Sequence, residues 1–351
     1  MSTTHAERSP TERAPAERFP AALDAGIALV RPALRAAVRD YLSHDTELVA
    51  GYHHGWSDEQ GRPTEEWSGK LVRPSLVLLS ARSAGADPAD GVAAAVAVEL
   101  VHNFSLLHDD IMDNDSARRG RATAWTLFGV PRAILAGDAL LAAATGVLLD
   151  SGKPGAGSAA NSLTTATRRM ISGQAADVEF ERRDDVTLDE CLRMAGDKTG
   201  ALLSCACSIG AELLGADAEP LHRLARFGEH LGVAFQLVDD LLGIWGDPER
   251  TGKQVLADIR VRKKSLPLVF ALNESGSDEL SALYHGSEPL EERQVRRVAE
   301  LVERAGGREW AHEELARRVV AARECLEHDD LSPSVREELL EMAAFLTDRR
   351  F

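Results

Sequence analysis

The chain has 351 residues, enough to bury a sizeable core in one large or two ordinary domains. Its formal net charge of −16 at pH 7 argues against nucleic acid or an anionic membrane as the main partner. The four cysteines form no CxxC pair and have no zinc-type spacing. They are expected to be small core residues of a protein in the reducing cytoplasm.

Residues 1–18 are rich in Ser, Thr, Pro, Glu and Arg and contain no apolar segment. This composition is typical of neither a signal peptide nor a membrane anchor, and it predicts a disordered tail. The alternative is a docking peptide for a partner. Residues 19–351 are expected to form one domain.

Apolar residues recur at helical spacing from Ala21 to Leu42. A polar loop is expected over residues 51–68, with His53 and His54 as solvated side chains rather than metal ligands.

The sequence GKLVRP follows this loop and leads into an apolar helix. It places Lys70 and Arg73 three residues apart, so both side chains share one face. Two cations at a helix N-terminus favour an anion there.

Residues 92–111 are apolar on nearly every face, which predicts a helix buried within a bundle. The first acidic box, HDDIMDND, ends this helix. Asp109 and Asp113 are one turn apart, with Cβ atoms roughly 5–6 Å from each other. Two carboxylates so close repel unless a divalent cation lies between them, and Mg²⁺ suits so few oxygen ligands. Arg118 and Arg119 come next and match phosphate oxygens.

The next helix is expected over residues 131–149. Residues 171–180 contain GQAADVEF, in which Gln174 and Asp177 are three residues apart. Residues 188–214 are predicted to form a helix broken at Asp197-Lys198-Thr199-Gly200.

The second acidic box lies at the end of a buried helix expected over residues 224–245. Asp239 and Asp240 stand there, and a cationic segment that begins with Lys253 follows. One arrangement therefore occurs twice in the sequence: a buried helix, paired acids at its C-terminal end, and then a cationic segment.

No strand pattern of useful length and no run long enough to span a bilayer is visible. The predicted fold is all-α, a single large helical bundle around a central cavity. If the two acidic boxes face each other, their carboxylates can hold several Mg²⁺ ions around a diphosphate. The cations suffice for two diphosphates: Lys70, Arg73, Arg118, Arg119, Lys198 and Lys253.

Apolar walls are expected below the acids, formed by Val101, Phe104, Leu107, Phe235 and Val238. A polar mouth above an apolar shaft fits an amphiphile with a diphosphate head. Metal and arginine can stabilise the departing diphosphate. Thr199 and Gln236 are candidates to line the allylic cation.

These motifs together resemble the trans-isoprenyl diphosphate synthase (polyprenyl synthetase) family: GKxxRP, HNFSLLHDDIMDxDxxRRG, GQxxD, KT and FQxxDDxxGxxGDPxxxGK…KKSLP. The resemblance extends from about Gly69 to Leu268. It implies that Asp109 and Asp113 bind two Mg²⁺ ions and Asp239 a third.

By the same resemblance, two groups of cations divide the substrates. Arg118, Lys198 and Lys253 would hold the allylic diphosphate. Isopentenyl diphosphate would lie against Lys70, Arg73, His102 and Arg119. Gln174, Thr199 and Gln236 would line the reacting carbons, and the family implies a homodimer.

One position departs from the family pattern. The second box commonly reads DDxxD, whereas this chain has DDLLG, with Gly243 in place of the third acid. Activity is expected to survive, with some change in metal affinity. A catalytically silent partner subunit is the alternative.

Product length is expected to depend on Phe104, about 7.5 Å before Asp109 along the helix, and on the small Ser105. This pair resembles the geranylgeranyl-producing type, and a farnesyl product is the alternative. A class I terpene cyclase would not need the second group of cations. A non-catalytic subunit, or cargo of an encapsulin-type shell bound through residues 1–18, is a further alternative.

Overall fold

The computed structural model describes residues 20–64, 69–246, 256–274, 276–286 and 288–348. The predicted tail and the predicted site residue Lys253 therefore lie outside the described residues. Within the described residues the regular secondary structure is helical apart from one very short hairpin and an isolated β-bridge, and the prediction of an all-α fold is confirmed.

The first half of the chain supplies the helices that surround the site. They are α1 (Ala21–Tyr41), α2 (His44–His53), α3 (Val72–Ser83), the 3₁₀ turn η1 (Pro88–Gly91), α4 (Val92–Met112), α5 (Ala124–Phe128), α6 (Val130–Leu149) and α7 (Ala156–Phe180). Between α4 and α5, β1 (Ala117–Arg118) pairs antiparallel with β2 (Arg121–Ala122).

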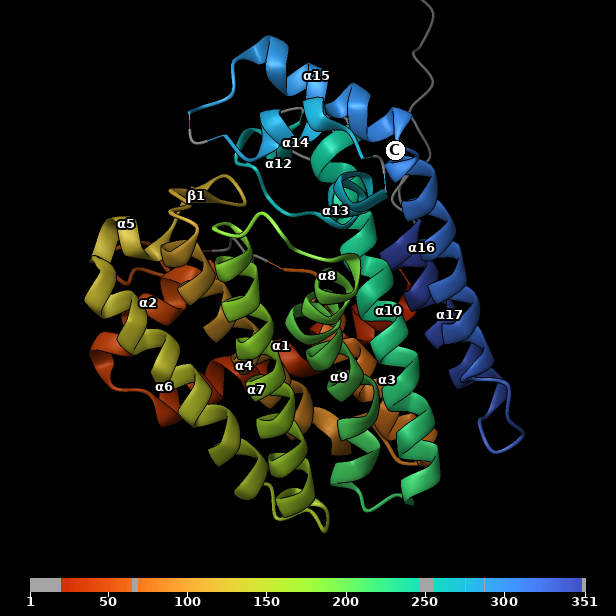
Figure 1. Ribbon diagram of the computed structural model, residues 1–351. Helices are drawn as coiled ribbons and strands as arrows, with labels where there is room; N and C mark the ends of the chain where they lie inside the picture. The colour runs from red at the N-terminus through yellow and green to blue at the C-terminus, as the bar shows by residue number, and fades with distance from the viewer. Residues whose placement is uncertain (1–19, 65–68, 247–255, 275, 287, 349–351) are drawn as a thin grey trace, which may run out of the picture.

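The second half completes the bundle and adds a smaller group of helices at one end (Figure 1). Its elements are α8 (Leu188–Ala195), the π-helix η2 (Gly196–Gly200), α9 (Ala201–Leu213), α10 (Ala218–Trp245), α12 (Ala257–Arg260), α13 (Leu266–Glu274), α14 (Asp278–Tyr284), α15 (Glu292–Arg304), α16 (Gly307–Glu324) and α17 (Pro333–Thr347).

Helix α4 is the centre of the bundle because apolar residues occupy almost its whole circumference. It packs against α3, α6 and α9, while α9 lies between α3, α7 and α10. Figure 1 shows α6, α7, α9 and α10 running side by side, with α16 and α17 along one edge. The C-terminal ends of α4 and α10, which carry the two acidic boxes, lie on the same side of the bundle.

The predicted break at residues 197–200 is confirmed as a π-helical turn. Such single-turn π segments are frequent at functional sites because they redirect side chains that a regular helix would align differently. Helix α7 passes close to this turn: a Cβ atom added to Gly173 would lie 2.2 Å from the backbone nitrogen of Lys198. Only glycine permits α7 and the π turn to come so near.

The expected loop over residues 51–68 is wrong in its first part, because α2 continues to His53. His54 is not solvated either. Its side chain is buried, with 2% exposed, and its ring stacks on Trp56 at a centroid distance of 4.2 Å. The adjacency of two histidines does not reveal that one ring stacks on Trp56, two residues further on.

Two helical segments are long and apolar enough, by length and composition alone, to cross a membrane: Pro88–Met112 and α6. The expectation that no run has this property is therefore wrong. In the apolar windows concerned, 67% of the residues of the first segment and 39% of those of α6 are buried inside the fold. Since α4 and α6 pack against each other, core packing accounts for much of this apolarity.

Candidate active site

A cavity of about 1840 Å³ lies among α3, α4, α7, η2, α9 and α10. Its lining includes every predicted site residue that the structure describes. These are Lys70, Arg73, His102, Phe104, Ser105, Asp109, Asp113, Arg118, Arg119, Gln174, Lys198, Thr199, Gln236 and Asp239. The volume exceeds that of an ordinary small-molecule pocket and leaves room for two substrates.

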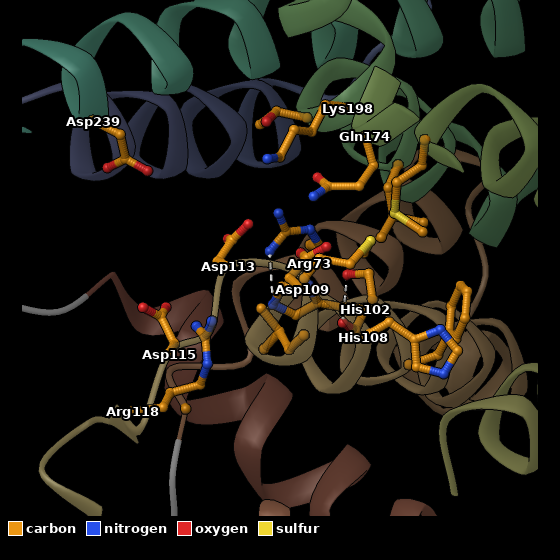
Figure 2. Close-up of a pocket in the computed structure, with 18 of the residues that line it drawn as sticks. Arg73, His102, His108, Asp109, Asp113, Asp115, Arg118, Gln174, Lys198 and Asp239 are labelled. Carbon is orange, nitrogen blue, oxygen red and sulfur yellow. Dashed lines mark hydrogen bonds between the residues drawn. The ribbon is translucent and has the colours of Figure 1, made fainter. Parts of the chain in front are cut away.

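The carboxylates that line the mouth come from two helices. Asp109 and Asp113 lie at the C-terminal end of α4, and Figure 2 shows Asp239 of α10 across the cavity from them. Burial is the main reason that the pKa of Asp109 rises to about 6. Lys198 lowers this pKa, and the neighbouring Asp113 raises it further. These carboxylates are thus held together at an electrostatic cost that a bound cation would offset.

The second acid of each box does not face the cavity but fixes a cation beside it. Asp110 is buried and accepts a hydrogen bond of 2.6 Å from Nε of Arg118. Asp240 is also buried and accepts bonds from Nζ of Lys263 at 3.2 Å and from the backbone N–H of Leu266 at 2.9 Å. Each box therefore combines an acid on the cavity with an acid that anchors a cation.

The β1–β2 hairpin presents Arg118 and Arg119 to the cavity. Its two central residues, Arg119 and Gly120, both have positive φ, of 52° and 77°. This is the conformation of a type I′ turn, in which glycine at the second position avoids strain. The expectation of no strand pattern of useful length left this hairpin undetected, because two residues per strand give no alternating pattern.

Arg73 and His102 form a pair on the facing sides of α3 and α4 (Figure 2). Nη1 of Arg73 lies 3.2 Å from Nε2 of His102. Burial, together with the positive charge of Arg73 and Arg119, lowers the pKa of His102 well below its ordinary value. The ring is therefore neutral, and its Nε2 accepts the bond because a guanidinium can only donate.

Near this pair, Nζ of Lys70 lies 4.9 Å from the ring centroid of Phe345. The end of α17 consequently borders the mouth.

The π turn packs against α7 and α10 and places Lys198 and Thr199 at the cavity. Nζ of Lys198 donates a hydrogen bond of 2.5 Å to Oδ2 of Asp177 on α7. Oγ1 of Thr199 donates to Oε1 of Gln236 at 2.8 Å, and Nε2 of Gln236 donates to Asp240 at 2.9 Å. These bonds set the orientation of the Gln236 amide, with its oxygen beside the hydroxyl.

Gln174 is buried and lines the cavity. Among the described residues, neither its amide oxygen nor its amide nitrogen has a hydrogen-bond partner. Buried polar groups in folded proteins are nearly always paired, so this amide indicates a ligand in the cavity.

The expected apolar walls are right for Phe104 and Phe235, which line the cavity. They are wrong for Val101, Leu107 and Val238, which are fully buried on the faces of α4 and α10 that pack against other helices. Helical period shows that such residues are buried but not on which side. The walls instead include Leu141, Met170, Ile171, Ala175, Val178, Leu202 and Leu203.

Sequence reasoning missed Glu99 of α4, which also lines the cavity. Its side chain is only 7% exposed, and Oε1 accepts a bond of 3.0 Å from Asn103. Burial raises the pKa of Glu99 to about 7, although Asn103, Arg73 and Arg119 each lower it. The available signal was an acid in the apolar part of this helix, before the acidic box.

Gly243 stands on α10 where the family pattern has a third acid, and the carboxylate of Asp258 fills the space beside it. A Cβ atom at Gly243 would lie 2.1 Å from Oδ2 of Asp258, which is buried. Nζ of Lys263 lies 3.7 Å from the same oxygen and also bonds to Asp240. Although burial lowers the pKa of Lys263, Asp240 and Asp258 raise it well above its ordinary value. A carboxylate from α12 thus occupies the space beside Gly243, a role that the sequence did not reveal.

Comparison with known proteins agrees with this geometry. The profile of the family described as polyprenyl synthetase matches residues 59–302. The chain is 46% identical over 327 residues to a (2E,6E)-farnesyl diphosphate synthase of Mycobacterium tuberculosis, covering 92% of this chain and 91% of that protein. A geranylgeranyl diphosphate synthase of the same species is 42% identical over 294 residues, with 83% and 84% covered.

The fold comparison points to the same class. A polyprenyl synthetase from Streptomyces coelicolor superposes with a TM-score of 0.88 at 50% identity, covering 93% of this chain and 98% of that one. A geranylgeranyl pyrophosphate synthetase from Geoglobus acetivorans has a TM-score of 0.80 at 34% identity, with 93% and 99% covered. The bundle with facing acidic helix ends defines an isoprenoid synthase, and the chain belongs to the polyprenyl synthetase family. It is a short-chain isoprenyl diphosphate synthase.

Replacing Gly243 by Ala should displace Asp258 from its place beside α10, because the added Cβ atom would collide with the carboxylate. We expect a loss of about 1–3 kcal/mol in the free energy of unfolding, measured with urea. Gly243→Asp should lose more, since it also adds a like charge beside Asp258.

The control for this collision is the double variant with Asp258→Ala. Residues that act through one contact are not additive, so Gly243→Ala should lose much less in that background. Equal losses with and without Asp258 would contradict the interpretation.

Glu99 should make the stability of the ligand-free protein depend on pH. Its folded-state pKa of about 7 lies above the ordinary 4.5, so the folded protein binds this proton more tightly than the unfolded chain. This contribution is complete below about pH 4.5 and is lost as the pH rises to 7. Glu99→Gln should therefore raise the free energy of unfolding at pH 8, relative to pH 5, by about 3 kcal/mol. Glu313→Gln, at an exposed ion pair on α16, should not.

Proposed function

We propose that the protein condenses isopentenyl diphosphate with an allylic diphosphate and that its main product is geranylgeranyl diphosphate. The observation that supports this reaction is one cavity with facing carboxylates, two groups of cations and an apolar wall. A cyclase acting on a single diphosphate does not need the second group. The relatives named as synthases also favour this activity over a cyclase or a silent subunit.

The proposed assignment of the two subsites follows the positions of the cations. Arg118, Lys198 and Lys253 hold the allylic diphosphate, of which Lys253 lies outside the described residues. Lys70, Arg73, His102 and Arg119 hold isopentenyl diphosphate. The neutral His102 fits this role because it accepts a bond from Arg73 and so orients the guanidinium.

Asp109, Asp113 and Asp239 are proposed to hold Mg²⁺, three ions in all. Among the described residues, no three acidic, histidine or cysteine side chains converge closely enough to hold an ion by themselves. This fits Mg²⁺, which keeps several waters and takes substrate phosphates as ligands. The bound ions would supply Lewis-acid stabilisation of the negative charge on the leaving diphosphate.

The residues of the chain then stabilise the allylic cation and exclude water. The hydrogen bond from Thr199 leaves the oxygen of Gln236 in a fixed orientation beside the hydroxyl, and Gln174 presents its buried amide to the same cavity. Such oriented dipoles favour a cation without reorganising during the reaction. Arg118 remains charged against Asp110 and can pair with the released diphosphate.

Two properties of the product site support geranylgeranyl diphosphate. Phe104 lies in the wall of the shaft beyond Asp109, and Ser105 next to it leaves space. A farnesyl product is the second candidate, and the 46% identical farnesyl diphosphate synthase favours it.

We also propose that the protein is a cytoplasmic homodimer. Exposed apolar side chains gather on α5 and α6, at Leu127, Val130, Ile134 and Leu135, the last of these 58% exposed. A second copy of this chain would bury this face. Docking of residues 1–18 to an encapsulin-type shell remains a prediction that concerns residues outside those described.

The test is incubation of the purified protein with Mg²⁺ and either dimethylallyl, geranyl or farnesyl diphosphate, with and without isopentenyl diphosphate, followed by mass spectrometry. Products of twenty carbons that require isopentenyl diphosphate are expected. Products of fifteen carbons would establish the farnesyl alternative. Turnover of an allylic diphosphate alone would indicate a cyclase, and no turnover with any primer would contradict the proposal.

Phe104→Ala should lengthen the products, because removing the ring opens the shaft beyond Asp109. The ratio of longer to shorter chains should rise at least tenfold, roughly the discrimination that a filled pocket gives against extra methylenes. Phe128→Ala is the control, since that ring lies outside the cavity lining. An unchanged product distribution would show that Phe104 does not limit chain growth.

A further inference from the structure

The backbones of α4 and α6 approach each other closely near the C-terminal end of α4. A Cβ atom added to Gly137 on α6 would lie 2.4 Å from Nε2 and 2.6 Å from Cδ2 of His108 on α4. Nε2 of His108 lies 3.1 Å from the backbone oxygen of Ile134. Because a carbonyl oxygen only accepts, Nε2 carries the proton and donates this bond. The ring of His108 is thus held directly against the backbone of α6.

The same ring supports the floor residue of the shaft. The rings of His108 and Phe104 meet edge to face, with centroids 4.8 Å apart and an interplanar angle of 70°. This is a favourable geometry for two aromatic rings, and it restricts where the Phe104 ring can lie. Figure 2 shows His108 on the side of the site away from Asp239 and Lys198. Phe104, His108 and the neighbouring α6 residues Asp138 and Leu141 all line the cavity.

Asp138 of α6 adds a charge beside the imidazole. Its Oδ1 lies 3.8 Å from Nε2 of His108, and more than half of its side chain is exposed. His108 directly precedes Asp109 on α4, so the imidazole lies on the mouth side of Phe104. The imidazole therefore restricts the Phe104 ring from the mouth side.

We propose that His108 sets the length of the allylic product, as a positioning residue held by Gly137 and acting on Phe104. The absence of a side chain at Gly137 lets the imidazole lie back against α6, and this determines how much of the shaft remains open. The inference rests on the proposed function. It means that the close contact of α4 and α6 determines which of two products, differing by one isoprene unit, is released.

Two substitutions test this device in opposite directions. Gly137→Ala pushes the imidazole away from α6 and into the cavity that it lines, so the products should become shorter. His108→Ala removes the support that holds the Phe104 ring across the shaft, so the ring can turn aside and the products should become longer. Each should change the ratio of twenty-carbon to fifteen-carbon products at least tenfold, measured by mass spectrometry at equal substrate conversion.

The double variant separates a specific contact from general damage to the helix. In the His108→Ala background, Gly137→Ala has no ring to displace, so it should no longer shorten the products. This readout, product length at equal conversion, is not moved by a mere loss of folded enzyme. If Gly137→Ala does not fold, His108→Ala alone decides.

A matched control exists on the same helix. A Cβ atom at Gly146 would also meet an aromatic ring, lying 2.7 Å from Cε1 of Tyr41, but neither residue lines the cavity. Gly146→Ala should leave the product distribution unchanged, and an equal shift there would overturn the proposal. Wild-type products with no change in either His108→Ala or Gly137→Ala would also overturn it. No product from the wild type would instead refute the proposed function.

Discussion

The main constraint on this structure is the repulsion between the carboxylates that α4 and α10 place at one cavity. Asp109 and Asp113 stand together on α4, and Asp239 faces them. Burial is the main cause that raises the pKa of Asp109 to about 6, and the nearby Asp113 raises it further. Cations lie beside these carboxylates, and the second acid of each box fixes their positions. Asp110 binds Arg118, and Asp240 binds Lys263. The fold thus holds like charges together, which is stable only because opposite charges are fixed beside them.

Glycines determine how closely the helices around this charge can approach. Gly173 admits the π turn that carries Lys198, and Gly243 admits the carboxylate of Asp258 beside α10. In both places a side chain would meet the neighbour at little more than 2 Å. The same property that weakens an isolated helix therefore sets the dimensions of the cavity.

The sequence predicted most of the helices, the break at residues 197–200 and a set of polar residues that line the cavity, because helical period and acidic spacing are local signals. It failed where the outcome depends on contacts between distant segments. Helical period could not tell that Val101 faces the core while Phe104 faces the cavity. Nor could it show that Asp258 takes the space left by Gly243, since that contact joins α12 to α10. His54 was misjudged for another reason: its ring stacks on Trp56, only two residues further on, and the polar composition of the segment gives no sign of this burial.

The buried Glu99 gives the cationic side of the cavity a property of its own. Its carboxyl group titrates near neutral pH while it lies in the field of Arg73 and Arg119. An anion held by those arginines would offset their positive charge and make the negative form of Glu99 less favourable. Occupation of that subsite is therefore linked to proton uptake from solvent, and the enthalpy of binding will vary with the ionisation enthalpy of the buffer.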